Sequence, residues 1–146
     1  MAKLARDVMT KDPACCTADT PLDQVARLMV QYNCGEIPVI DRSDRPIGVV
    51  TDRDVVCRVV AAGRNPIGQT ALDCMSAPVF TVPADSTIED VVATMEEHQV
   101  RRLPVVDDRG CCTGIISQAD VVTATPPRTA AELVWEISRD TGRQSL

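Results

Sequence analysis

Residues 48–54 read GVVTDRD, and residues 114–120 repeat the same pattern as GIISQAD. Each stretch contains a glycine, two β-branched apolar residues, a hydroxyl residue, two variable positions and an aspartate. The apolar residues favour a short strand, and a hydroxyl residue three positions before a carboxylate is typical of a helix start. Each stretch therefore predicts a strand that passes directly into a helix.

The similarity extends outward from these two stretches in both directions. When the sequence is shifted against itself by 66 residues, positions 7–56 align with positions 73–122 without a gap and share 13 identities. Met9, for example, falls on Met75. Repetition at a fixed offset over this length indicates two copies of one structural unit.

The pattern of each copy predicts a strand, a helix, two strands and a second helix, so we expect an α/β (α+β) fold. The first helix of each copy is expected to begin at a hydroxyl residue, Thr20 or Ser86, with Pro21 at the first helical position. The strands are expected at 14–16, 37–40 and 47–50 in the first copy and at 79–82, 103–106 and 113–116 in the second.

Turn-forming residues divide the chain into four parts. Glycine and proline are concentrated between the copies, where they favour a linker. A last helix is expected from Thr129, as N-cap, to Ser138. The predicted division is a first copy at 1–61, a linker at 62–72, a second copy at 73–124 and a C-terminal extension at 125–146.

Charge and composition exclude several classes of protein. A net charge of -6 and a pI near 4.7 argue against a general binder of nucleic acid or of anionic membranes. Aromatic residues make up only 2% of the chain, so we expect an aliphatic core. Charged residues occur at the N-terminus before any apolar run, and no apolar stretch is long enough to span a bilayer, so we expect a cytoplasmic protein.

Residues that support catalysis or metal binding are sparse. His98 is the only histidine, and no nucleophile elbow, phosphate-binding glycine loop or metal-binding helix motif occurs. The seven cysteines include no Cys-x-x-Cys pair, so we expect no metal site and mostly free thiols, with redox sensing as an alternative. We therefore do not expect an enzyme.

The duplicated motifs resemble the cystathionine-β-synthase (CBS) domain. The resemblance rests on the two stretches quoted first and on VRRLPVVD at residues 100–107, and it extends over residues 5–124. The layout is similar to stand-alone bacterial two-CBS proteins (Bateman modules), including relatives of a hypoxic-response protein. It implies a tandem CBS-domain pair, in which two β-α-β-β-α repeats pack through their sheets about a pseudo-twofold axis and leave two clefts.

The resemblance also implies where an adenosine ligand binds. Asp54 and Asp120 are the expected acceptors for the ribose hydroxyls, and Thr51 and Ser117 are expected beside the phosphate, since a helix start presents free N–H groups. The alternative is that each hydroxyl–aspartate pair only caps a helix, and the two roles are compatible. The strand residues expected to enclose the purine are Ile37, Val50, Leu103 and Ile116.

Arg101 and Arg102 are the candidates for binding phosphate, because arginine pairs with phosphate through two parallel hydrogen bonds. Their counterparts in the first copy are Gly35 and Glu36, and an acidic residue repels phosphate. The two clefts are therefore expected to differ in affinity, while the sequence leaves open which cleft the arginines serve. The alternative is that the arginines form a solvated turn.

These features predict a regulatory adenine-nucleotide sensor, expected as a homodimer that binds AMP, ADP or ATP and reports to an unidentified regulated protein. NAD and S-adenosylmethionine are further candidate ligands, and no cofactor is required. The alternative is a protein-interaction or thiol-redox stress-response module with no nucleotide ligand.

Overall fold

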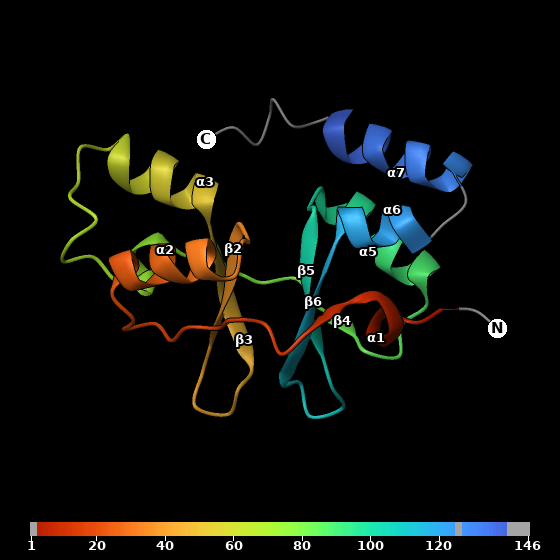
Figure 1. Ribbon diagram of the computed structural model, residues 1–146, viewed down its shortest axis with the longest axis horizontal. Coiled ribbons are helices and arrows are strands. Elements are labelled where there is room, and N and C mark those ends of the chain that lie inside the picture. Colours follow the sequence, from red (N-terminus) through yellow and green to blue (C-terminus); the bar gives the residue numbers. More distant parts are fainter. Residues whose placement is uncertain (1–2, 125–126, 140–146) are drawn as a thin grey trace. The chain divides into compact units, whose positions relative to one another are not determined.

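The chain forms two compact units in the computed structural model, which describes residues 3–124 and 127–139 (Figure 1). One unit comprises residues 13–79 and is called here the first-copy unit. The other, the second-copy unit, combines residues 1–12 with residues 80–146. An α/β pair of repeated units is thus present, as the sequence predicts.

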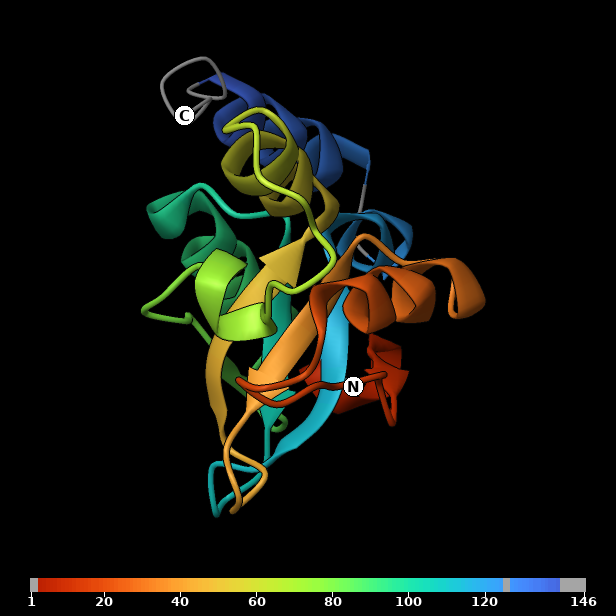
Figure 2. The same cartoon turned by 90° about the vertical axis from the view of Figure 1, so that its left-hand side faces the viewer.

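The first-copy unit is an antiparallel hairpin packed against one long helix. Its elements are α2 (Leu22–Gln31), β2 (Glu36–Ile40), β3 (Pro46–Thr51), α3 (Asp52–Asp54), the π-helix η1 (Val55–Val60) and α4 (Ala71–Cys74). α2 buries Leu22, Val25 and Met29, whose spacing of three and four residues places them on one helix face. This face and the strand residues form one hydrophobic cluster, and Figure 2 shows the orange and yellow elements from the side.

The second-copy unit contains a four-stranded sheet in the order β1-β6-β5-β4. Its elements are α1 (Ala5–Val8), β1 (Thr10–Lys11), β4 (Val82–Pro83), α5 (Ile88–His98), β5 (Arg102–Val106), β6 (Cys112–Ser117), α6 (Gln118–Ala124) and α7 (Pro127–Arg139). α5 contributes Ile88, Val91, Val92 and Met95 to an aliphatic core. None of the helices in the part of the chain described here combines the length and apolar character required to cross a membrane.

Each unit contains the first segment of the other sequence copy. β1 pairs with β6 in the second-copy unit, with Thr10 opposite Ile115. The equivalent bridge in the first-copy unit joins Ser76 to Val49. The compact units therefore differ from the sequence repeats, since residues 1–12 pack with the second copy and residues up to 79 with the first. The boundaries predicted for the repeats describe the duplicated sequence and stay a prediction.

Two strand glycines permit these segments to pack closely against β3 and β6. A Cβ atom on Gly48 would lie 2.9 Å from the carbonyl oxygen of Ser76, and one on Gly114 would lie 2.9 Å from that of Thr10. A side chain at either position would force the backbones apart. The glycines of the repeated motif thus have a packing role.

The helix starts differ in detail from those predicted. Pro21 is the N-cap of α2 rather than its first helical residue, and its side chain has no group that could cap the helix. The Thr20 hydroxyl instead accepts a hydrogen bond from Thr17 N at 3.0 Å, within the preceding turn. At α5 the capping hydroxyl belongs to Thr87, which accepts from Asp90 N at 3.2 Å, and not to Ser86.

The ends of three other predicted elements also shift. α7 begins at Pro127, two residues before Thr129, and ends at Arg139. The predicted strand at 14–16 is reduced to one bridge from Cys16 to Val39, and that at 79–82 to β4. α4 begins inside the predicted linker. In α7, Ile137 is 3% exposed and Trp135 is 60% exposed, so the tryptophan lies off the packed face. Residues 125–126 and 140–146 lie outside the described residues.

Candidate functional site

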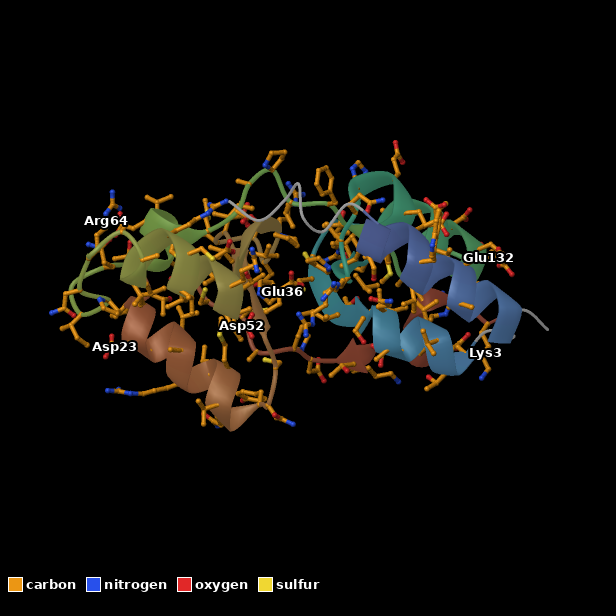
Figure 3. All side chains as sticks on the ribbon, turned by 90° about the horizontal axis from the view of Figure 1, so that it is seen from above. Lys3, Asp23, Glu36, Asp52, Arg64 and Glu132 are labelled. Atoms are coloured by element: carbon orange, nitrogen blue, oxygen red, sulfur yellow. The ribbon has the colours of Figure 1, made fainter. Side chains whose placement is uncertain are left out.

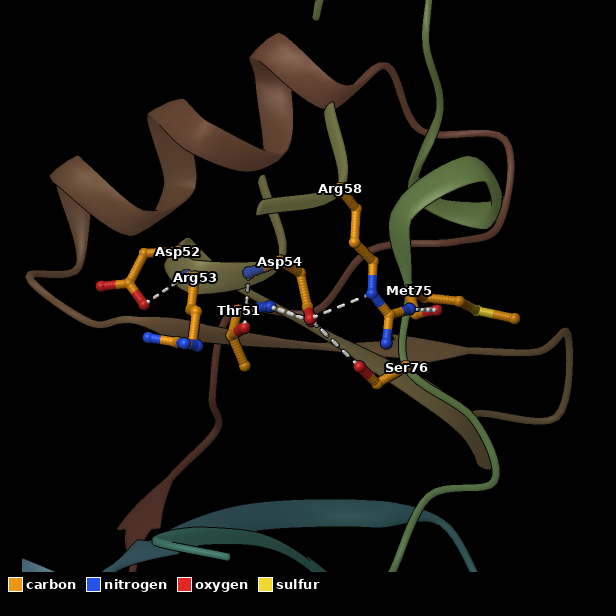
Figure 4. Close-up of polar contacts among 7 residues, drawn as sticks. All are labelled: Thr51, Asp52, Arg53, Asp54, Arg58, Met75 and Ser76. Carbon is orange, nitrogen blue, oxygen red and sulfur yellow. Dashed lines mark hydrogen bonds and ion pairs between the residues drawn. The ribbon is translucent and has the colours of Figure 1, made fainter. Parts of the chain in front are cut away.

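The repeated motif forms a capping box in the first-copy unit. Asp54 N donates to the Thr51 hydroxyl oxygen at 3.0 Å, and Thr51 N donates to Asp54 Oδ2 at 3.0 Å (Figure 4). β3 brings Thr51 to the helix start, and its extended backbone directs both groups at one another. Two backbone N–H groups are thereby satisfied.

The same box recurs in the second-copy unit at β6 and α6. Ser117 N donates to Asp120 Oδ2 at 2.9 Å, and Asp120 N donates to the Ser117 hydroxyl at 3.1 Å. The capping role considered from the sequence is therefore present in both copies. It does not exclude a ligand role, because a carboxylate has about four acceptor positions and the box occupies one of them.

Asp54 has two further partners that the motif does not reveal. The Ser76 hydroxyl oxygen lies 3.2 Å from each Asp54 carboxylate oxygen, and Arg58 Nε lies 3.7 Å from Oδ1 (Figure 4). Arg58 follows Asp54 by four residues, a spacing at which helical side chains meet, so sequence inspection had a signal for it. Ser76 lies 22 residues away and belongs to no motif shared with Asp54, so its contact depends on the tertiary fold.

The apolar residues expected to surround a purine are buried. Ile37 pairs with Val50 across β2 and β3, and Leu103 pairs with Ile116 across β5 and β6. Each of the four side chains is at most 1% exposed and belongs to the core of its own unit. They contribute to stability in this structure, and their contact with a ligand stays a prediction.

The basic and acidic counterparts of the two copies lie beside the capping boxes. In the antiparallel register Arg102 is opposite Ser117, and Glu36 is opposite Thr51. Residues directly opposite one another project to the same face of the sheet, so Arg102 lies on the side of Ser117. In the first-copy unit this place is taken by Glu36, which is labelled with Asp52 in Figure 3.

Both arginines are exposed. Among the described residues, neither guanidinium forms an ion pair, and Arg101 contributes its carbonyl oxygen to a 2.7 Å hydrogen bond from Gln118 N. The equivalent bond in the first copy runs from Asp52 N to the Gly35 carbonyl at 3.0 Å. The structure therefore brings Arg102, Ser117 and Asp120 into one unit and leaves the cations accessible.

Two thiols are poor candidates for redox chemistry. Burial raises the pKa of Cys16 to about 11, and burial together with the nearby Asp54 carboxylate raises that of Cys74 to about 11. The thiolate is the reactive form, so both side chains are protonated and inert near neutral pH. His98 stacks against Phe80, with ring centroids 3.7 Å apart.

Residues 5–61 and 71–126 match the CBS domain family. Hypoxic response protein 1 of Mycobacterium tuberculosis is 33% identical over 133 residues, which cover 91% of this chain and 92% of that protein. That relative is thus a stand-alone CBS protein without a separate catalytic domain. An uncharacterised protein of Methanopyrus kandleri is 37% identical over 121 residues, covering 83% of this chain, and this chain spans only 59% of that protein's length.

Solved structures have the same fold. The crystal structure of hypoxic response protein 1 with two coordinated zinc ions has a TM-score of 0.77 and 34% identity, covering 85% of this chain and 100% of that one. CBSX2 of Arabidopsis thaliana in complex with AMP has a TM-score of 0.70 and 28% identity, covering 83% and 94%. Within residues 3–124 and 127–139, no three His, Cys, Asp or Glu side chains lie together as a metal site.

Proposed function

Because the chain belongs to the CBS-domain family, as a tandem pair of CBS domains, we propose that it is a regulatory module that binds an adenine nucleotide such as AMP, ADP or ATP. One observation carries this proposal: the hydroxyl–aspartate box occurs in both units with the same geometry. A relative of known structure that is 28% identical was solved with AMP, which supports the choice of ligand class.

The proposed roles follow from the chemistry of the box. One oxygen of Asp54 or Asp120 is oriented by the backbone N–H of Thr51 or Ser117, and the carboxylate retains acceptor positions for the two hydroxyls of a ribose. The Thr51 and Ser117 hydroxyls lie beside the phosphate in this proposal, and Arg101 and Arg102 neutralise it. Binding shifts the population of two packing states by the difference in affinity between them, and a partner protein detects the shift.

The test compares AMP with 2′,3′-dideoxy-AMP, which lacks the ribose diol. At about 100 times its Kd, AMP is expected to raise the free energy of unfolding by about 2.7 kcal/mol in thermal or urea denaturation. The dideoxy compound is expected to produce a much smaller increase, because it offers no donors to the carboxylates. ATP, NAD and S-adenosylmethionine measured in parallel identify the preferred adenosine ligand.

The matched variant is Asp54→Asn with Asp120→Asn. Asparagine keeps a carbonyl oxygen for the capping box but loses the anionic acceptor, so the fold is expected to persist while AMP stabilisation disappears. A folded wild-type chain that none of the four adenosine compounds stabilises contradicts the proposed function. Unchanged AMP affinity in the double variant contradicts the assignment of the two aspartates.

A further inference from the structure

The two aspartates of the repeated motif have different surroundings, although their capping boxes are alike. Both oxygens of Asp54 lie within hydrogen-bond distance of the Ser76 hydroxyl, so its single proton is shared between them. The Arg58 guanidinium provides a positive charge at the same carboxylate. A ribose diol that approaches Asp54 therefore has to replace protein partners rather than water alone.

Both partners of Asp54 are themselves held by the backbone. Ser76 N donates to the Val49 carbonyl at 2.8 Å, and Val49 N donates to the Ser76 carbonyl at 3.1 Å. Arg58 Nη1 donates to the Met75 carbonyl at 3.1 Å (Figure 4). Ser76 is thus fixed through its backbone and Arg58 through its guanidinium, so both groups are held beside the Asp54 carboxylate before a ligand arrives.

The second-copy unit provides a matched comparison. The positions equivalent to Ser76 and Arg58 under the 66-residue offset are Thr10 and Ala124. Alanine has no charged or polar side chain, and Thr10 is exposed in β1. Among the residues that the structure describes, the hydrogen bond to the Asp120 carboxylate comes from Ser117 N alone. The rest of this carboxylate is available to a ligand.

The charges beside the two aspartates also favour ligand binding at Asp120 over Asp54. The exposed Arg102 stands across the strand pair from Ser117, whereas Glu36, only 6% exposed, stands across from Thr51. A phosphate near Ser117 meets Arg102, whereas one near Thr51 meets Glu36 and an Arg58 cation that is already paired with Asp54. The hydrogen bonding of the aspartates and the charges beside them are independent observations that favour the same site.

We propose that the two sites fill in order: a 5′-phosphorylated adenosine ligand binds first at Asp120, because Ser76 and Arg58 occlude Asp54. This inference rests on the proposed function and adds the residues that decide which site is filled first. Ser76 and Arg58 act through Asp54 as positioning residues. The first-copy site accepts ligand only when the Ser76 hydroxyl and the Arg58 guanidinium are displaced.

Calorimetric titration with AMP tests the order of filling. The wild-type chain is expected to bind one AMP tightly and a second more weakly. Asp120→Asn is expected to weaken the tight site at least about tenfold, the size of effect of losing a hydrogen bond to a charged group, whereas Asp54→Asn leaves that site in place. Loss of the tight site in Asp54→Asn, or two equal sites in the wild-type chain, overturns the order.

Ser76→Ala tests the occluding contact directly. Removing the competing hydroxyl is expected to tighten the weak site about threefold to tenfold, while the matched variant Thr10→Ala leaves both sites unchanged. Arg58→Gln is expected to act in the same direction, and a weaker first-copy site in this variant overturns the role of Arg58. If none of AMP, ATP, NAD and S-adenosylmethionine binds the wild-type chain, the proposed function itself is wrong, which separates that failure from an incorrect order.

Discussion

Cys16 and Cys74 show how burial controls the chemistry of single residues in this protein. Each is a core side chain of the first-copy unit, and the pKa of each thiol is raised to about 11. In the unfolded chain both thiols regain an ordinary pKa near 9. Between these two values the folded chain retains protons that the unfolded chain has lost, so these thiols stabilise the fold less as the pH rises.

We therefore expect the free energy of unfolding to fall between pH 9 and pH 11, with the contribution of the two thiols fully present below pH 9. Urea denaturation at several pH values measures this dependence. Other groups titrate in the same range, so the control is the double variant Cys16→Ala and Cys74→Ala, whose dependence on pH is expected to be shallower. Parallel curves for the two proteins contradict the assignment.

The aspartates of the motif cap a helix, and in the proposed function they also accept hydrogen bonds from a ribose. Asp54 caps a helix, accepts a hydrogen bond from the Ser76 hydroxyl and faces Arg58. Asp120 caps a helix, and within the described residues its carboxylate accepts a hydrogen bond only from Ser117 N. The asparagine variants separate the two tasks, because the amide oxygen preserves the cap. The same residue type at equivalent positions thus has different hydrogen-bond partners.

At the scale of elements, Gly114 lets β1 lie against β6, and Gly48 lets the segment at Ser76 lie against β3. Gly114→Ala is expected to destabilise the chain by about 1–3 kcal/mol, the usual range for overpacking, because the new methyl group meets the Thr10 carbonyl. Urea denaturation measures the loss. Met9 also approaches this position, but a side chain can move and a carbonyl in a strand pair cannot.

The double variant Met9→Ala with Gly114→Ala tests that distinction. It is expected to remain destabilised, since shortening Met9 does not move the backbone of β1. Full recovery of stability in the double variant means that the methionine side chain, and not the backbone, requires glycine. The Gly48→Ala variant is expected to behave similarly in the first-copy unit, against Ser76.

At the scale of the whole molecule, each unit contains the first segment of the other sequence copy, so its stability depends on a distant part of the sequence. Ala5 is 0% exposed and belongs to the core of the second-copy unit, although it lies in the first copy of the sequence repeat. Ala5→Asp is expected to destabilise that unit by about 3 kcal/mol or more, because a charge would be buried without a partner. Lys3→Asp, at an exposed position, is the control.

Hydrogen exchange resolves which unit responds. Amides of β5 and β6 are expected to lose protection in Ala5→Asp, while those of β2 and β3 keep it. Loss of protection confined to the first-copy strands contradicts the packing of Ala5 in the second-copy unit. The sequence repeat places residue 5 in the first copy, whereas the structure places it in the second-copy unit. The pattern of lost protection therefore distinguishes the two assignments.

The sequence by itself determined the features that depend on nearby residues. The 66-residue repeat, the amphipathic helices, the strand pairs and both capping boxes follow from spacing within a few residues, and local backbone geometry realises them. Local patterns also account for the errors: α2 starts one residue after Pro21, and α7 starts at Pro127 although the sequence predicts Thr129 as its N-cap.

Only the tertiary structure decided which distant segments meet. Nothing in the sequence assigns residues 1–12 to the second copy or directs the Ser76 hydroxyl to Asp54, because the choice among long-range partners depends on how whole elements pack. The burial of Ile37 and Leu103 in separate cores has the same origin. Spacing along the chain specifies a local motif, but packing free energy selects its neighbours, and those neighbours make the two aspartates unequal.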